Sequence, residues 1–455
     1  MAISNSDIPS VMASATDAMS GIVRMLAFQP LSVGTWSSPP LAAMTGQLPT
    51  ADDIFRRQGR TADGPGPREW PAVGLALAAV GWGANQFAPM LLVYRAELGV
   101  SEATVQATYG LYAAGLIPGL LLGGPFSDRY GRRRVLAPAL TISVLASLLL
   151  MAGGIGVEWL FVGRLVAGVA SGAAFSSGTA WIKELSPVGP ERGSGARRAT
   201  VAMTAGFASG PLIAGLLAQW GPSPTLVSYV PHVVLTLASL PLVLRTRETR
   251  SPRPDATLWE PLRLPVASRR RFRNVVVPLA PWVFGASSIA LAYLPGLVRD
   301  SLGDSGLVFS AVVTALTMLA GIAVQPLARR VNRRGGSPSL ATASALVVAG
   351  LLLSAGAAET SRPLLVTVAA LVLGAGYGCC LVCGLTEVQA MARADNLARL
   401  TAIFQSLAYL GFAAPYLLAV IERVLPAPWL LLAAAFVAGL ALAWTTFRAA
   451  SAGAQ

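Results

Sequence analysis

The sequence predicts an all-α membrane protein in which twelve transmembrane helices form two pseudo-symmetric six-helix bundles. Three observations support this fold class: a low content of charged residues, a regular series of uncharged stretches and an internal repeat. Of the 455 residues, 54% are hydrophobic and only 12% are charged, whereas a soluble domain has about a quarter charged residues. So few charges cannot cover a surface in water, and we therefore expect lipid to surround the chain.

Uncharged stretches of membrane-spanning length follow one another along the chain. Those without any charge are 70–94, 103–127, 135–157, 274–298, 305–328, 335–358, 363–386, 400–421 and 424–447. The window 159–182 contains only Arg164, and the longer stretch 199–244 is broken by a predicted turn at Trp220–Thr225. Each piece approaches the roughly 20 residues that cross a bilayer core. The predicted total is twelve spans.

Basic residues are concentrated in alternate loops. The loops that follow odd-numbered spans hold only Arg95, Arg299, Arg362 and Arg423, whereas the other loops and the flanks hold 28. The positive-inside rule therefore predicts a multi-pass protein of the inner (plasma) membrane with both termini in the cytoplasm. We interpret the net charge of +13 as a consequence of this topology. The basic residues are expected to contact membrane lipids and not nucleic acid.

These spans divide the chain into two halves and three polar regions. We expect a disordered cytoplasmic tail at 1–68, or in part an upstream start, with Met25 or Met44 as the true first residue. Two six-helix bundles are predicted at 69–245 and 274–448. A basic cytoplasmic linker at 246–273 joins them, and a short tail at 449–455 follows.

An internal repeat relates the two halves. The run Gly124–Arg133 after span two reappears as Gln325–Arg334 after span eight, 201 residues later. Glu184 at the end of span four and Glu387 at the end of span ten are 203 residues apart, and the Gly-Phe-Ala run of span five returns in span eleven at an offset of about 204. Duplicated six-helix bundles that face each other across a central cavity are a transporter architecture.

One loop carries a recognisable signature, made of Gly124, Asp128, Arg129, Gly131, Arg132 and Arg133. It resembles the loop 2–3 signature of the major facilitator superfamily, G-x-x-x-D-R-x-G-R-R/K, and lies where that family has it. The resemblance covers residues 70–448. It implies alternating access, with this cluster latching the halves together on the cytoplasmic side.

Each type of residue in this loop signature has an expected task. Gly124 and Gly131 would permit close backbone approach, and Asp128 would face a helix N-terminus or a nearby arginine. The three arginines would hold the loop against the cytoplasmic leaflet. The alternative is that the cluster only anchors the topology.

Span five contains Gly206, Gly210, Pro211 and Gly215. These residues resemble the superfamily's antiporter signature, G-x-x-x-G-P-x-x-G-G, with Ala214 in place of one glycine. Glycines four residues apart allow close helix contact, and the proline permits a bend. The motif favours export over uptake, and the alternative is ordinary packing of small residues.

Two titratable or charged side chains fall inside spans. Arg164, followed by Gly168 and Gly172, resembles the arginine of the family's fourth-helix motif. The resemblance implies that Arg164 assists proton transfer or binds an anionic group. The alternative is that Arg164 snorkels to the outer surface. His232 is the sole histidine; it either carries a proton or is a hydrogen-bonded structural residue.

In the family fold, spans one, four, seven and ten line the cavity. The candidate lining residues are Asn85, Gln86, Trp282, Ser287, Tyr293 and Tyr377. Such a lining suits amphiphilic or apolar substrates. No window contains a carboxylate, so both proton coupling and uniport stay open. Cys379, Cys380 and Cys383 are read as small apolar residues, and we expect no metal and no cofactor.

The sequence therefore predicts a monomeric secondary transporter that exports small amphiphilic or drug-like molecules, with proton antiport as an open option. The alternative within the class is an uptake symporter or facilitator for sugars or organic acids. A different class is a transport-inactive receptor or lipid scramblase on the same fold. We do not expect an enzyme, because one histidine and no carboxylate within the spans cannot assemble a catalytic site.

Overall fold

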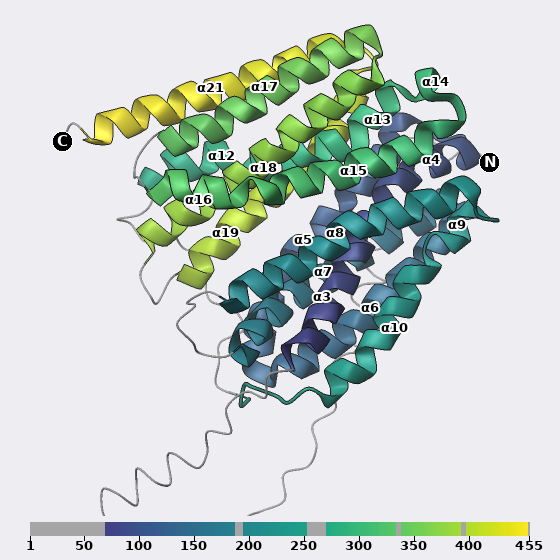
Figure 1. Ribbon diagram of the computed structural model, residues 1–455, viewed down its shortest axis with the longest axis vertical. Coiled ribbons are helices and arrows are strands. Elements are labelled where there is room, and N and C mark those ends of the chain that lie inside the picture. The colour runs from purple at the N-terminus through teal and green to yellow at the C-terminus, as the bar shows by residue number, and fades with distance from the viewer. Residues whose placement is uncertain (1–68, 187–193, 253–269, 334–337, 393–396, 454–455) are drawn as a thin grey trace, which may run out of the picture. The chain divides into compact units, whose positions relative to one another are not determined.

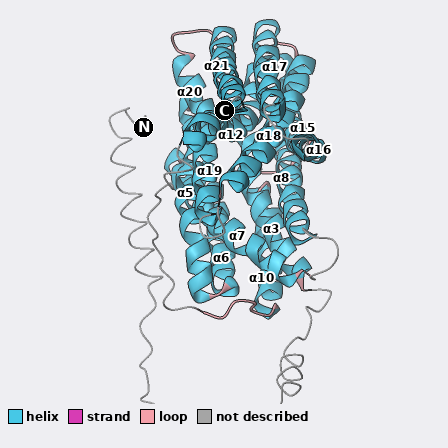
Figure 2. Ribbon diagram, turned by 90° about the vertical axis from the view of Figure 1, so that its left-hand side faces the viewer, coloured by secondary structure: helices cyan, strands magenta, loops and turns pink. Residues whose placement is uncertain are grey.

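The computed structural model describes residues 69–186, 194–252, 270–333, 338–392 and 397–453. The elements in these ranges are all helices, shown in Figures 1 and 2. Twelve of the described segments are long and apolar enough to cross a membrane. The predicted fold class and the predicted number of spans are confirmed, and the chain is a multi-pass membrane protein.

The first six spans are built from nine helical elements. They are α3 (Trp70–Asn85), α4 (Phe87–Leu98), α5 (Glu102–Tyr130), α6 (Arg132–Met151), η1 (Ala152–Gly154), α7 (Val157–Leu185), α8 (Ser194–Trp220), α9 (Pro224–Val227) and α10 (Val230–Arg245). We call this part of the chain the first half.

The last six spans contain more interruptions, with π-helical and 3₁₀ turns inside spans seven and eleven. The elements are η2 (Phe272–Val276), α12 (Val277–Ser288), η3 (Ile289–Tyr293), α13 (Leu294–Leu297), α14 (Arg299–Leu302), η4 (Gly303–Ser305), α15 (Gly306–Ala323), α16 (Gln325–Arg333), α17 (Pro338–Thr360), α18 (Pro363–Met391), α19 (Leu397–Tyr409), η5 (Leu410–Ala413), α20 (Ala414–Ile421) and α21 (Ala427–Gly453). We call this part the second half.

Residues 67–455 form one compact unit, so the predicted bounds of the two bundles stay predictions. The predicted tail at 1–68 and residues 253–269 of the predicted linker lie outside the described residues. We call the end of the spans that is next to the linker the linker end, and the opposite end the far end. The linker end holds Tyr130, Leu185 and Arg245, and the far end holds Arg95 and Glu102.

The helices extend beyond the uncharged windows from which they were predicted. The window 103–127, for example, becomes the helix Glu102–Tyr130. Charged side chains at a helix end can reach the headgroup layer while their backbone stays helical. The predicted break between spans five and six is confirmed, because α8 ends at Trp220, α9 begins at Pro224 and Ser223 between them has a φ of 49°.

Glycine brings spans two and four into close contact. A Cβ placed at Gly115 on α5 would clash with the carbonyl oxygen of Leu165 on α7, and one at Gly168 on α7 would clash with the carbonyl oxygen of Tyr112. Helices in lipid gain no hydrophobic free energy from meeting each other, so close backbone packing through small residues stabilises such pairs.

Spans eight and ten of the second half pack in the same way. A Cβ at Gly374 on α18 would overlap the carbonyl oxygen of Thr317 on α15, and one at Gly378 would overlap that of Gly321. The second and fourth spans of each half are thus joined through glycine. This shared packing is the pseudo-symmetry that the sequence repeat predicts.

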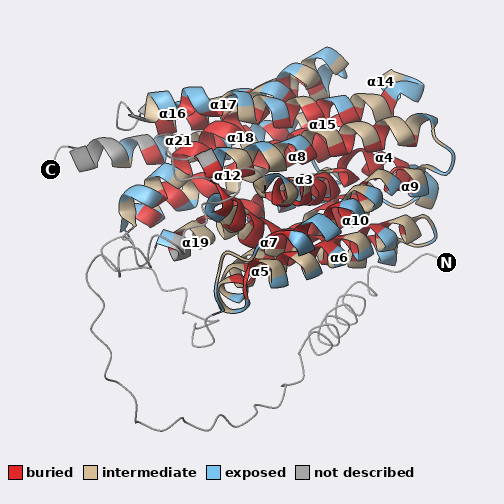
Figure 3. Cartoon of the chain, turned by 60° about the horizontal axis from the view of Figure 1, so that its bottom comes forward, coloured by how far each residue is buried: buried red, intermediate tan, exposed pale blue. Residues whose placement is uncertain are grey.

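Buried residues gather where the helices face one another, as Figure 3 shows. Large apolar side chains such as Trp429, Phe436 and Phe447 on α21 stay exposed, as expected for a surface that faces lipid. The two halves meet through two sets of helices: α8 packs against α15, and α5 packs against η5 and α20. These contacts place α5 and α8 at the boundary between the halves.

Candidate functional site

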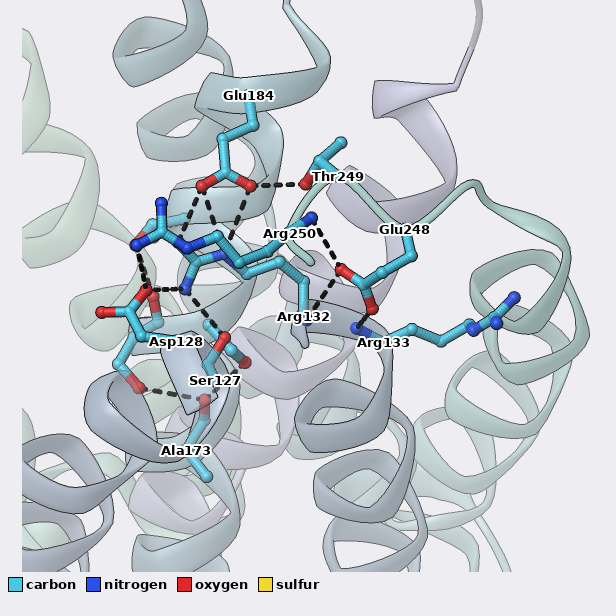
Figure 4. A network of polar contacts seen from close by, with 12 residues as sticks. Ser127, Asp128, Arg132, Arg133, Ala173, Glu184, Glu248, Thr249 and Arg250 are labelled. Carbon is cyan, nitrogen blue, oxygen red and sulfur yellow. Dashed lines mark hydrogen bonds and ion pairs between the residues drawn. The ribbon is translucent and has the colours of Figure 1, made fainter. Parts of the chain in front are cut away.

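The loop signature forms a network of charged residues at the linker end (Figure 4). Arg132 is buried, and its guanidinium lies 2.7 Å from a carboxylate oxygen of Glu184 at the end of α7 and 2.9 Å from one of Asp128. Arg132 also donates a hydrogen bond of 2.9 Å to the hydroxyl of Ser127. Arg250, at the start of the linker, lies 3.8 Å from Asp128. Asp128 therefore faces nearby arginines, which was one of its two expected arrangements.

A linker residue caps span three. The carboxylate of Glu248 accepts hydrogen bonds of 2.9 Å from the backbone N–H groups of both Arg132 and Arg133, the first two residues of α6. An acidic group at this position satisfies unpaired donors and interacts favourably with the helix dipole. Gly131 makes the approach possible: its φ is 105°, and a Cβ there would lie 2.7 Å from Glu248. The sequence does not indicate Glu248, because nothing local distinguishes it from the other charged residues of the linker.

Two expectations about the loop signature are wrong for one residue each, Gly124 and Arg132. In the part of the chain that the structure describes, no atom beyond its own chain neighbours and helix backbone lies within 4 Å of a Cβ placed at Gly124, so this glycine does not serve close packing. Arg132 turns inward to Glu184 and does not hold the loop against a lipid leaflet. Arg133 is exposed and donates to the carbonyl oxygen of Leu244. The guanidinium of Arg129 lies over the ring of Tyr130.

Replacing the two glycines of the loop signature by alanine should change the stability of the protein differently. Gly131→Ala should destabilise the protein by about 1–3 kcal/mol, because alanine is strained at a positive φ and its methyl group would press on Glu248. Gly124→Ala should leave stability unchanged or raise it by up to about 1 kcal/mol, because alanine favours the helix. Thermal unfolding of the purified protein in detergent measures both effects. Equal unfolding temperatures for the two variants would contradict this prediction.

The glycines of span five are packing positions against two different helices. A Cβ at Gly206 would clash with the carbonyl oxygen of Ala78 on α3, and one at Gly210 would lie 2.7 Å from the carbonyl oxygen of Trp82. A Cβ at Gly215 would instead clash with the methyl group of Ala311 on α15, in the second half. Pro211 lies within α8 between these contacts. Helix α8 therefore packs closely on span one and on span eight.

Arg164 is fully buried in the first half. Its guanidinium donates to the carbonyl oxygens of Ala84 at 3.2 Å and Tyr109 at 3.4 Å. It also lies 4.6 Å from the ring centroid of Phe87 and 4.4 Å from that of Tyr112. Carbonyl oxygens and ring faces both present negative potential to a cation. The alternative that Arg164 snorkels to the surface is wrong, because the side chain reaches no solvent.

His232 lies in a buried cluster of hydroxyl groups. Its Nδ1 is 2.8 Å from the hydroxyl of Ser147, and its Nε2 is 3.2 Å from Thr236 and 3.4 Å from Ser143. Gly83 on α3 lies so close that a Cβ there would be 2.5 Å from Nε2. The histidine therefore joins spans one, three and six through polar and packing contacts.

The two polar candidates of span one point to different helices. Gln86 is fully buried and donates to the hydroxyl of Ser147 at 3.2 Å, so it belongs to the histidine cluster and does not line a central cavity. Asn85 is partly buried and donates to the carbonyl oxygen of Phe207 on α8 at 3.4 Å. The prediction that Gln86 lines the cavity is wrong.

The predicted lining residues of spans seven and ten also lie in different places. The hydroxyl of Tyr293 donates to Glu422 at 3.0 Å, and Tyr293 lines a cavity at the far end. Ser287 donates to the carbonyl oxygen of Phe284 on its own helix, and Trp282 packs against the core. Tyr377 lies midway along the spans, with its ring centroid 5.6 Å from that of Phe284. Residues predicted as one lining thus occupy separate places.

Six aromatic rings from both halves form one cluster, which we call the aromatic cluster. Phe284 stacks on Tyr409 with ring centroids 4.4 Å apart and planes 11° apart. Phe412 lies 5.4 Å from Phe284 and 5.5 Å from Tyr109. The members of the cluster are Tyr109, Tyr112, Phe284, Tyr377, Tyr409 and Phe412.

Tyr377 is the one member of this cluster among the residues that the sequence predicts to line the cavity. A signal for four other members was present, because Tyr109 and Tyr112, like Tyr409 and Phe412, are three residues apart and share a helix face. They lie on spans two and eleven, outside the four spans expected to line the cavity. Phe284 lies on span seven, where the predicted lining residues are instead Trp282, Ser287 and Tyr293.

The sequence profile of the Major Facilitator Superfamily matches residues 72–415. The chain is 27% identical over 277 residues to a chloramphenicol resistance protein of Pseudomonas aeruginosa, which covers 60% of this chain and 64% of the relative. It is 34% identical over 79 residues to a multidrug resistance protein of Klebsiella pneumoniae, covering 17% of the chain and 20% of the relative.

A third relative is a puromycin resistance protein of Streptomyces alboniger, 31% identical over 171 residues, or 36% of this chain and 33% of the relative. The chain therefore matches less than two thirds of the length of each of these relatives. Among solved structures, a D-xylose–proton symporter covers 83% of this chain and 95% of its own, with a TM-score of 0.63 and 17% identity.

A peptide transporter in complex with sulfate covers 85% of this chain and 94% of its own, with a TM-score of 0.69 and 14% identity. At such identities these structural likenesses concern the fold alone.

Proposed function

The chain belongs to the Major Facilitator Superfamily and is a transporter, and we propose that it exports small amphiphilic, drug-like molecules by alternating access in exchange for protons. The observation that carries this proposal is the aromatic cluster. Its rings come from both halves, so a molecule bound against them would contact both halves at once. Such a molecule could couple its binding to their relative movement.

The cluster also favours a substrate class. Stacked and tilted rings offer apolar faces that suit flat aromatic molecules. Arg164 lies beside it, 4.4 Å from the ring of Tyr112, while the carboxylates of the spans lie near their ends. A positive charge in a medium of low dielectric repels cations over several ångströms. We therefore propose that neutral and anionic aromatic compounds are better substrates than cationic ones.

The proposed direction of transport, export, rests on the relatives and on one sequence motif. The relatives described above are named as resistance proteins, and the glycines of α8 resemble the antiporter signature. In this proposal the linker end, rich in arginine, faces the cytoplasm of the cell and the far end faces outward. The network around Asp128 then acts on the cytoplasmic side.

Resistance profiling tests direction and substrate class together. Expression in a strain that lacks its own exporters should raise the inhibitory concentrations of neutral and anionic aromatic compounds several-fold, and those of aromatic cations less. Flux in proteoliposomes with an imposed pH gradient tests proton exchange. Growth on a sugar or an organic acid, without any change in resistance, would instead support uptake.

Removing one ring of the aromatic cluster should weaken substrate binding. Phe412→Ala should raise the KM for a transported aromatic compound about fivefold, corresponding to the loss of about 1 kcal/mol of aromatic contact. The control is Phe436→Ala, since Phe436 is an exposed residue of α21 outside the cluster. An unchanged KM for the first variant, or equal effects of both, would remove the cluster from the binding site.

Neutralising the acid of the loop signature should slow substrate flux more than neutralising an acid elsewhere. Asp128→Asn removes the charge that faces Arg132 and Arg250, and it should slow flux about fivefold, as expected for about 1 kcal/mol in a partly exposed ion-pair network. Glu158→Gln changes an exposed acid at the start of α7 and should not slow flux. Measurements in proteoliposomes that show no difference between the two would argue against a role of this network in transport.

A further inference from the structure

A buried glutamine connects the two halves near the far end. Gln106 on α5 is buried, and its amide nitrogen donates two hydrogen bonds of 2.7 Å each. One goes to the carboxylate of Glu102, one turn earlier on the same helix. The other goes to the backbone carbonyl oxygen of Ala292 in η3, which belongs to the second half. The second bond joins residues 186 positions apart.

The first bond fixes the orientation of this glutamine. Glu102 lies 2.6 Å from the guanidinium of Arg95, so its carboxylate is held from the first half. With Glu102 fixed, one N–H of Gln106 is committed to it and the other is directed at Ala292. A charge-assisted bond to a carboxylate is stronger than a neutral one. Glu102 is therefore a positioning residue for the bond that crosses between the halves.

Beside this contact lies a cavity of about 750 Å³ at the far end. Its wall contains three arginines and three acids, contributed by both halves: Arg95, Arg299, Arg423, Glu102, Asp300 and Glu422. Tyr293, the neighbour of Ala292, also lines it and donates to Glu422. A cavity with so many charged groups will hold water. Water is thus available next to the bond between Gln106 and Ala292.

The nature of this bond suits a contact that forms and breaks in each cycle. It joins a neutral amide to a neutral carbonyl, and both groups could exchange the bond for water from the adjacent cavity. The net free energy of such an exchange is small compared with that of separating a buried ion pair. Glycine at position 110, one turn further along α5, lies against the backbone of Phe412 and keeps the helix close enough for Gln106 to reach.

We propose that Glu102, Gln106 and the carbonyl group of Ala292 form a far-end lock, whose bond between the halves must break before the far end can open. This inference rests on the alternating access in the proposed function. The lock closes the far end in the present structure. Breaking it leaves Gln106 paired with Glu102 in the first half and Ala292 hydrated in the second.

The test measures how far apart the halves lie at the far end, without any substrate. Spin labels are placed at Ala96→Cys in the first half and Asp304→Cys in the second, both at exposed positions, in a background where the three native cysteines are alanine. Pulsed electron paramagnetic resonance in lipid nanodiscs then gives the distribution of distances. The native lock should give mainly the short distance.

Removing the donor should shift this distribution. Gln106→Met keeps the length of the side chain but cannot donate, and the ratio of long to short distances should rise roughly tenfold. Glu102→Gln, which weakens the positioning, should give a smaller shift in the same direction. The matched control is Thr108→Val on the same helix: Thr108 is buried, but its hydroxyl bonds to Val105 of its own helix. Its distribution should match the native one.

The outcomes separate the lock from the proposed function. An unchanged distribution for Gln106→Met, or an equal shift for Thr108→Val, would overturn the lock. Gln106→Asn, which keeps an amide but shortens its reach, guards against a misfolded methionine variant and should also shift the distribution. If both Gln106 variants shift the distances but no aromatic compound is transported by the native protein, the lock stands and the proposed export function fails.

Discussion

The close packing of α5 on α7 is the constraint on which the other features of this protein depend. The glycines at this interface, among them Gly115 and Gly168, bring the two backbones into contact, because side chains of any size would hold the helices apart. Helix α5 carries Gln106 and Tyr109 near its start at the far end, and Asp128 at the linker end. Fixing this helix therefore fixes the positions of all three side chains.

Helix α7 contributes the partners that the packing brings near. Arg164 reaches the carbonyl oxygen of Tyr109 and the ring of Tyr112, and Glu184 at the other end of the same helix reaches Arg132. A buried guanidinium needs negative potential around it. The spacing between the two helices supplies that potential from backbone and ring faces, so a positive charge is retained without a carboxylate beside it.

The two halves share their packing but differ in charge. Glycine joins the second and fourth spans in both, yet the position that corresponds to Asp128 is Arg329 in the repeat. At the linker end of the second half, Arg271 instead pairs with Glu387. The fold can therefore be symmetric while the network of Asp128, Arg132, Glu184 and the start of the linker belongs to the first half. This asymmetry gives the two halves different chemistry at the linker end.

The sequence by itself determined the number of spans, the break at Trp220 and the repeat, because the thickness of a bilayer and the exclusion of charge from it act on consecutive residues. It also indicated that Asp128 faces a positively charged group and that the glycines of α8 allow close helix contact. Only the tertiary structure decided which neighbour each side chain meets. It buried Arg132, left Gly124 uncrowded and turned Gln86 toward α6. It also brought Glu248 to the start of that helix and assembled the aromatic cluster. These outcomes depend on the rotation and crossing of helices distant in sequence, and a one-dimensional pattern of hydrophobicity does not specify them.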